Sequence, residues 1–438
     1  MTATTSERIL STARKEGAEA EVFHVTSKQV PVEFEDNELN MIESSSAEGI
    51  ALRMIKDGKM GFGATTRTGA EDTLVAQILS AIPFGTSAEF TFPGATDYPE
   101  IETFDPRVTA LSPDALVDTG NKILEAIRTH EPDAQVNISV AKGEGHVLLH
   151  NTSGLSAARE HTVYSVFFHA SYVDDGGGLL HIADYFGGTH FLDESDRVIR
   201  DARKHLALGK KKATIKSGRY PVIFTPRALS DLLRPLLACI DGDAVARKIS
   251  PWRERHGEDV VDPRVSLYDD GLLPLGAGSL PWDDEGIPSQ TTPLIEKGQL
   301  KNFLLDLKNS ARLGLSPTGN GMRGGLSASP GISLSNLVMA PGETHLRDLF
   351  SAVSEGLVIH SLMGAWGANP YGGQVSGNVA LGFKIENGES IGRVKDCMVY
   401  LNAFDAWQHQ LQAISTETEQ RHSHRLPYVL MEGVDVAT

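Results

Sequence analysis

The sequence predicts an α+β protein, in which a mixed N-terminal α/β region precedes a mainly antiparallel β C-terminal domain. Glycine is plentiful, with 43 residues, and short apolar runs lie between glycine-containing turns, a pattern that favours tight turns and antiparallel strands. Clear helical periodicity is confined to a few segments, all before residue 241. The length of 438 residues exceeds one compact core and indicates more than one domain.

Residues 1–212 are expected to form the N-terminal α+β domain, with candidate subregions 1–83 and 107–212. Ile9, Leu10 and Ala13 give an apolar stripe to a short helix that ends before Gly17. Strands are expected at Glu21–Ser27, Val30–Glu35, Leu39–Glu43, Gly49–Ile55 and Met60–Thr65. The Asp57-Gly58 pair predicts a hairpin between the last two. Leu74, Ile78 and Ile82 then recur at helical spacing.

The second subregion begins with a well-marked helix, because Ser112 has the chemistry of an N-cap and Pro113 suits the first helical position. Strands follow at Val136–Val140, His146–His150, Thr162–Val173 and Leu179–Phe186, and Asp193–Leu208 is expected as a charged surface helix. The domain boundary is expected between Lys210 and Gly218. Residues 213–438 then form the β-rich domain, in which Arg227–Ile240 is a helix after the strand Tyr220–Thr225.

The charge excludes some functions. The formal net charge of −17 repels nucleic-acid phosphates and anionic membranes, so neither is expected as a direct partner. Cys239 and Cys397 form no CxxC pair, and Cys397 is expected in a strand. The first ten residues carry Glu7 and Arg8 and lack the apolar run of a signal peptide, so a cytoplasmic location is expected.

Several motif matches fail the test of context. Gly319–Gly324 fits GxGxxG but lacks the preceding strand and following helix of a dinucleotide site, so a mobile glycine loop is expected. Gly388–Gly392 fits GxSxG, but Asn387-Gly388 predicts a hairpin between Leu381–Ile385 and Val394–Tyr400 rather than a nucleophile elbow. His146 and His150 read as strand residues, too far apart along a strand to share one metal ion.

Two further groups are weighed in the same way. His422 and His424 form a weak metal pair without a third ligand, and an exposed polar loop is the expected alternative. The acidic runs Asp269-Asp270 and Asp283-Asp284-Glu285 are expected as solvated turn residues rather than as a cation site.

The order of the segments resembles that of the TldD/PmbA family, from about Gly17 to Val434. The matching runs are Phe34–Glu38, Glu48–Arg53, Asp57–Gly63, Trp282–Pro288, Leu294–Leu300, Thr318–Gly321 and Ile385–Gly388. The resemblance implies a heterodimeric zinc metalloprotease that degrades unfolded or flexible peptides. In that family, a TldD-like subunit carries an HExxxH helix, whereas a TldE/PmbA-like subunit lacks it.

At the matching helix this chain departs from the zinc motif. Arg234 stands at the first histidine, Pro235 at the glutamate and Cys239 at the second histidine. Arginine is a permanent cation and cannot bind zinc, and proline has no acid–base group. The chain is therefore expected to have no catalytic residue and no cofactor of its own, with zinc in the partner subunit.

The function that the resemblance implies is a non-catalytic TldE/PmbA-like subunit, with a TldD-like metalloprotease subunit and flexible peptides as its partners. Glycines let a peptide backbone come close because they have no side chain. The candidate substrate-binding residues are therefore Gly319, Asn320, Gly321, Gly372 and Gly373. Two alternatives stay open. One is a metallopeptidase in its own right, with an unconventional site from Cys239, His422 or His424. The other is a non-proteolytic binding or regulatory module.

Overall fold

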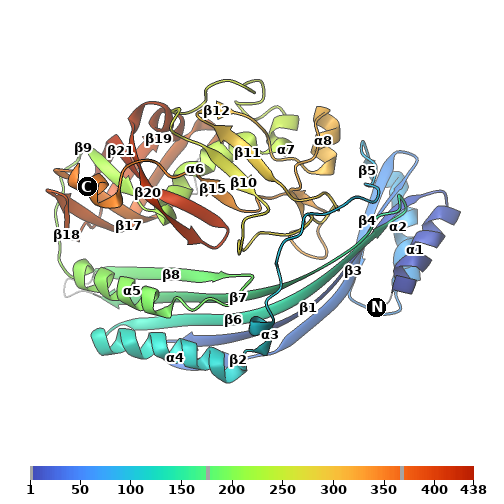
Figure 1. The fold of residues 1–438 in the computed structure, drawn as a ribbon, viewed down its shortest axis with the longest axis horizontal. Helices are drawn as coiled ribbons and strands as arrows, with labels where there is room; N and C mark the ends of the chain where they lie inside the picture. Colours follow the sequence, from blue (N-terminus) through green and yellow to red (C-terminus); the bar gives the residue numbers. More distant parts are fainter. Residues whose placement is uncertain (1–2, 174–177, 366–368) are drawn as a thin grey trace.

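The computed structural model describes residues 3–173, 178–365 and 369–438, which form two β-sheets with helices packed on and between them. Long, curved N-terminal strands run beneath the more compact C-terminal half (Figure 1). This arrangement bears out the α+β fold class. No helix in the described part of the chain is long and apolar enough to cross a membrane.

The first sheet has eight antiparallel strands in the order β5-β4-β3-β1-β6-β7-β8, with β2 paired to β1. Their bounds are β1 Glu19–Glu35, β2 Glu38–Ile42, β3 Ser45–Lys56, β4 Lys59–Thr65, β5 Thr86–Ser87, β6 Gln135–Asn151, β7 Ser156–Val173 and β8 Leu179–Gly188.

The sequence predicted each of β1 and β6 as two short strands, which is wrong. The polar residues that looked like breaks pair with one another: Lys28 lies opposite Glu144, and Gln29 lies opposite Gly143. Backbone hydrogen bonds across this pair hold both strands extended, although neither stretch contributes apolar side chains.

Five helices belong to the N-terminal half: α1 Ala3–Lys15, α2 Glu71–Ala81, α3 Pro106–Ala110, α4 Pro113–His130 and α5 Ser195–Gly209, and the 3₁₀ turn η1 Ile82–Phe84 follows α2. The predicted cap of α4 is confirmed, since Ser112 Oγ accepts a hydrogen bond of 3.2 Å from Ala115 N. Helix α4 packs Ile123 and Ile127 against the core that includes Phe34 of β1.

Helix α5 is more than the charged surface helix that the sequence predicted. Its apolar stripe, including Val198 and Leu206, is buried in a core that also contains Val358 and Phe383 of the C-terminal half. The helix therefore lies between the two sheets, and only its charged side reaches solvent.

The second sheet has eleven strands in the order β12-β11-β10-β15-β21-β19-β17-β16-β9, with β18 paired to β17 and β20 paired to β21. Their bounds are β9 Gly218–Phe224, β10 Leu267–Asp270, β11 Thr291–Glu296, β12 Gln299–Leu300, β15 Leu337–Met339, β16 Glu355–Met363, β17 Gln374–Glu386, β18 Glu389–Arg393, β19 Met398–Asn402, β20 Leu411–Arg421 and β21 His424–Ala437. Strands β13 Gly321–Met322 and β14 Gly331–Ile332 form a separate pair.

Strand β9 pairs with β16 on one side and with β21 on the other, so β21, β19, β17, β16 and β9 form a closed ring of hydrogen-bonded strands. Helix α6 Pro226–Ile240 packs against this ring, and its leucines share one core with Phe224, Ile359 and Met431. The shorter helices and turns are α7 Gly242–Ala246, α8 Leu307–Leu313, α9 Leu346–Ser351, η3 Pro370–Gly372, α10 Ala403–Asp405 and η4 Ala406–Gln410.

The Asn387-Gly388 hairpin is confirmed, and Gly388–Gly392 is therefore no nucleophile elbow. Its second strand is β18, directly after the turn, rather than the predicted Val394–Tyr400. Cys397 lies just before β19 and not in a strand as expected, although its side chain is buried.

Candidate functional site

Helix α6 occupies the position where the sequence resemblance places a zinc helix. It starts directly after β9, with Thr225 at the N-cap position and Pro226 at the first helical position. Leu229, Leu232, Leu233 and Leu236 bury one side of it completely. The second proline, Pro235, lies inside the helix and has no N–H for the carbonyl one turn earlier. Trp407 Nε1 donates to Leu232 O at 3.2 Å, which ties this part of α6 to η4.

The residues at the zinc-motif positions do not fit a zinc ion. Arg234 is a half-buried cation, and Pro235 is buried in the core. Cys239 is fully buried, and burial raises the pKa of its thiol to about 12, so that the thiol stays protonated at neutral pH. Within the described residues, no three His, Cys, Asp or Glu side chains group so as to hold a metal ion.

One face of α6 carries Arg227, Asp231 and Arg234, whose spacings of four and three residues place them in a single stripe. Burial raises the pKa of Asp231 to about 6, and the two arginines oppose that shift. The helix therefore presents cations and a weakened acid where a zinc helix presents imidazoles.

The histidine pair at the β20–β21 turn is split between two environments. His424 Nδ1 lies 3.2 Å from Ser230 Oγ on α6, whereas the His422 ring packs 5.4 Å from the ring of Tyr185 on β8. Burial lowers the pKa of both histidines, so both are neutral at pH 7. His424 is therefore half-buried against α6, whereas His422 is exposed in the turn, as expected of a polar loop.

The two candidate glycine segments have different surroundings. Gly372 ends η3, which packs beside α6, and it is exposed. Gly373 has a φ of 72°, and a side chain there would meet the ring of Phe404 at 2.6 Å. Asn402 Nδ2 donates to Gly372 O at 3.0 Å and so fixes the loop. Gly372 is thus exposed next to the helix, whereas Gly373 is buried.

Gly319–Gly321, in contrast, is buried. Asn320 has no exposed surface, and its amide donates to Asp269 Oδ2 at 2.6 Å and to Ser333 O at 2.9 Å. A Cβ built on Gly321 would lie 2.3 Å from Glu285 Oε2. These residues occupy a closed junction between the two halves of the molecule, where a passing peptide has no access in this conformation.

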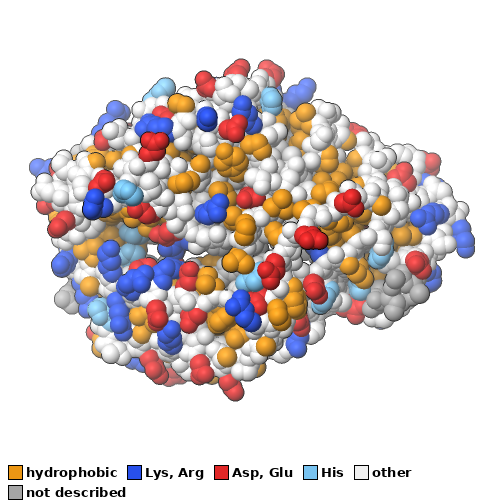
Figure 2. All heavy atoms as spheres, in the orientation of Figure 1, with side chains coloured by type: hydrophobic (Ala, Val, Ile, Leu, Met, Phe, Trp, Pro, Cys, Tyr) orange, Lys and Arg blue, Asp and Glu red, His pale blue; other side chains and the backbone are white. Residues whose placement is uncertain are grey.

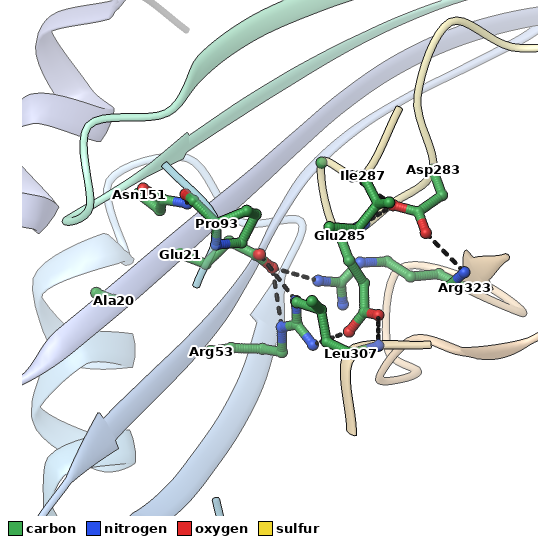
Figure 3. Close-up of polar contacts among 12 residues, drawn as sticks. Ala20, Glu21, Arg53, Pro93, Asn151, Asp283, Glu285, Ile287, Leu307 and Arg323 are labelled. Carbon is green, nitrogen blue, oxygen red and sulfur yellow. Dashed lines mark hydrogen bonds and ion pairs between the residues drawn. The ribbon is translucent and has the colours of Figure 1, made fainter. Parts of the chain in front are cut away.

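That junction is a network of buried ion pairs (Figure 3). Arg53 of β3 binds Glu21 of β1 through Nε and Nη2 at 2.9 and 2.8 Å, and it reaches Glu285 with Nη1 at 2.6 Å. Arg323 Nη2 adds a bond of 3.2 Å to Glu21. Each of these four side chains is at most 3 % exposed. Charges so far from water need partners, and here each side chain has at least one of opposite sign.

The acidic run in this network corrects a sequence prediction. Asp283, Asp284 and Glu285 were expected as solvated turn residues, but all three are buried, as is Asp269. Asp284 pairs with Arg159 of β7, whose guanidinium also stacks on the Trp282 ring at 4.2 Å. Backbone N–H groups bind Asp283: Glu285 N and Ile287 N donate to Oδ1, and Gly321 N donates to Oδ2, at 2.8–2.9 Å. Arginines from strands distant in the sequence thus offset the free-energy cost of burying these carboxylates.

Sequence reasoning missed Glu21, Arg53, Arg159 and Arg323 as the residues that join the two sheets. The sequence held one indication of their importance, because Arg53 and Asp283–Glu285 both lie in the runs that resemble the TldD/PmbA family. Nothing in the sequence, however, shows that these runs meet in space.

The fold defines a class: two-sheet α+β proteins in which a helix follows the first strand of the C-terminal sheet and packs against that sheet. Residues 217–438 match the PmbA/TldA metallopeptidase C-terminal domain, and residues 20–82 match domain 1 of the same group. The chain belongs to the TldD/PmbA family.

Relatives span the whole chain. An uncharacterized protein of Methanocaldococcus jannaschii is 27 % identical, with 98 % of each chain covered, and Escherichia coli O157:H7 metalloprotease PmbA is 22 % identical over 98 % of this chain and 94 % of that protein. The crystal structure of TldE from Thermococcus kodakarensis superposes with a TM-score of 0.92 at 23 % identity, covering 99 % of this chain and 100 % of that chain. A Thermotoga maritima protein described as a proposed modulator of a DNA gyrase has a TM-score of 0.89 at 27 % identity, with 99 % of both chains covered.

Proposed function

We propose that this chain is the subunit without a zinc site in a heterodimeric zinc metalloprotease that degrades flexible peptides, with a TldD-like chain as the catalytic partner. The observation that carries the proposal is α6. It lies where the sequence resemblance places the family's zinc helix, and it has Arg234 and Pro235 where that resemblance expects a ligand and a general base. Relatives of this chain include metalloproteases named TldD homologs, which are candidates for the partner type.

The chemistry of Cys239 supports the same assignment. A thiol with a pKa of about 12 is neither a zinc-binding thiolate nor a nucleophile at neutral pH. The helix therefore offers a partner subunit shape and charge, and no reacting group.

The exposed backbone at Gly372 is where this subunit would touch a peptide. Extended peptides bind through main-chain hydrogen bonds, which read no side-chain sequence and so suit a protease for unstructured chains. The buried segment Gly319–Gly321 contributes by holding the junction that carries this surface.

A mixing experiment tests the proposal. The purified chain, a TldD-like chain from the same organism, and both together are incubated with an unstructured fluorogenic peptide, with and without a zinc chelator. Cleavage is expected only in the mixture and only without chelator. Cleavage by this chain alone, or equal cleavage by the partner alone, would contradict the proposal.

A further inference from the structure

A cavity of about 500 Å³ lies between the N-terminal and C-terminal halves, next to the start of α6. Helix α5 and strand β8 form one wall, and β16, β20 and the first turn of α6 form the other. Its volume is in the range of pockets that bind small ligands. In Figure 2, Lys and Arg side chains gather over α5, where the surface is hollowed below the C-terminal half.

Each carboxylate that lines the cavity pairs with an arginine. Asp184 pairs with Arg197 at 2.8 Å and also with Arg421. The other acidic residues of the lining, Glu194, Asp201 and Glu419, each pair with one of these two arginines. The lining as a whole holds four carboxylates against four arginines and Lys204, so positive charge is in slight excess.

Arg227 is a further cation in the lining of the cavity. Its guanidinium donates to the carbonyl oxygen of Ala183, and within the described residues no carboxylate forms an ion pair with it. The side chain is exposed and lines the cavity together with Lys204. Desolvation lowers the pKa of Arg227 and the neighbouring Arg421 adds to the shift, whereas Asp184 and Asp231 oppose it.

The start of α6 adds hydrogen-bond donors at the same place. Thr225 lines the cavity at the N-cap position and is 4 % exposed, yet its hydroxyl caps no N–H of the helix and has no hydrogen-bond partner among the described residues. The first-turn N–H groups are thus without a side-chain cap, and such a helix end favours an anion. His205 and His360 close the cavity as neutral rings, 4.4 Å apart.

We propose that this cavity binds the C-terminal carboxylate of a peptide, with Arg227 as the ion partner and the N-terminus of α6 as the hydrogen-bond donor. The inference rests on the proposed function for its choice of peptide as the ligand. A carboxylate matches the unpaired guanidinium geometrically, because the planar fork of arginine binds two oxygens at once. The apolar side chains of Ile182 and Leu381 and the ring of Tyr428 in the lining suit the last side chains of such a peptide.

The test is binding by the full chain alone, without partner or zinc, which separates its outcome from that of the cleavage assay. An N-terminally labelled unstructured peptide is titrated by fluorescence anisotropy, once with a free C-terminal carboxylate and once as the amide. The acid is expected to bind about tenfold more tightly than the amide, as loss of a charge-assisted hydrogen bond predicts.

Arg227→Met is expected to remove that difference by weakening the acid about tenfold and leaving the amide unchanged. Arg219→Met is the matched control, since Arg219 lies on β9, pairs with Asp435 and does not line the cavity. It should keep the full difference, and melting temperatures should show that both variants fold.

Equal binding of acid and amide to the wild type would overturn the inference, as would an equal loss for both peptides in Arg227→Met. Inorganic phosphate serves as a competitor at constant ionic strength. If phosphate saturates the chain at lower concentrations than the peptide acid, the cavity is a phosphate site and the inference is wrong.

Discussion

Arg53 Nη1 lies 2.6 Å from Glu285 Oε1, although 232 residues separate them in the sequence. Arg53 belongs to β3 of the first sheet and Glu285 to the turn between β10 and β11, and both side chains are almost without solvent contact. This pair, with Glu21 and Arg323, fixes how the long N-terminal sheet meets the C-terminal half (Figure 3). The cavity beside the start of α6 also lies between the two halves.

Arg53→Met is expected to lower the free energy of unfolding by about 3–5 kcal/mol, since it leaves Glu21 and Glu285 buried without their main cation. Urea denaturation measures the change. Arg219→Met is the control, because Arg219 pairs with Asp435 at the exposed surface, where an ion pair contributes about 1 kcal/mol or less. Similar losses in the two variants would show that the buried pair does not hold the junction.

Asp231→Asn is expected to make the stability less sensitive to pH. The pKa of Asp231 is about 6 in the folded chain and 3.8 in an unperturbed side chain, so the folded state holds more protons between these values. This carboxyl favours folding fully below pH 4, and its contribution is lost as the pH rises through 6. At pH 7.5 the variant should be about 1 kcal/mol more stable than the wild type, and at pH 4 no more stable.

Thermal unfolding across pH 4–8 measures this effect, and Asp118→Asn, on an exposed position of α4, corrects for the loss of one charge. A constant difference between Asp231→Asn and the wild type over the whole range would mean that Asp231 does not titrate as its burial implies.

Cys239 and Cys397 are expected to resist alkylation in the native chain. Burial raises the pKa of Cys239 to about 12 and that of Cys397 to about 11, so almost no thiolate forms at pH 7.5. Mass spectrometry after treatment with a maleimide should find no label until denaturant is added. Rapid native labelling of Cys239 would reopen a reactive role for it.

Elemental analysis of the purified chain is expected to find no stoichiometric zinc, because Arg234 and Pro235 supply neither a ligand nor a base. The TldD-like partner, prepared in the same way, is the positive control. About one zinc per chain that is lost in Cys239→Ser, with the fold intact, would instead favour a metallopeptidase in its own right.

Two variants, Gly372→Ala and Gly373→Ala, test separately whether the loop beside α6 contacts the peptide and whether it stabilises the fold. Gly372→Ala should fold normally, since a Cβ there meets nothing within 4 Å, but it should raise the KM for peptide cleavage by the mixed subunits. Gly373→Ala should lose about 1–3 kcal/mol of stability, because φ is 72° and the Cβ lies 2.6 Å from the Phe404 ring. An unchanged KM in Gly372→Ala would remove this glycine from the proposed peptide surface.

The sequence by itself determined the features that depend on neighbours along the chain. The Ser112 cap, the Asn387-Gly388 hairpin and helix α6 all follow from local hydrogen bonding, backbone preference and periodicity. The residues Arg234, Pro235 and Cys239 were likewise sufficient to predict that α6 departs from a zinc helix, because side-chain chemistry does not depend on the fold.

Only the tertiary structure decided which charges are buried and which cavity they surround. In the sequence, the acidic run Asp283–Glu285 has the composition of a solvated turn. Only in the folded chain do Arg53, Arg159 and Arg323 contact this run. The sequence of β1 likewise predicts a break at Lys28, whereas in the structure the polar residues there pair with β6. Arg227 is an ordinary helix residue in the sequence. In the described part of the chain it is a cation without an ion pair in a cavity, because the carboxylates that β8, β20 and α5 bring to this cavity pair with other arginines.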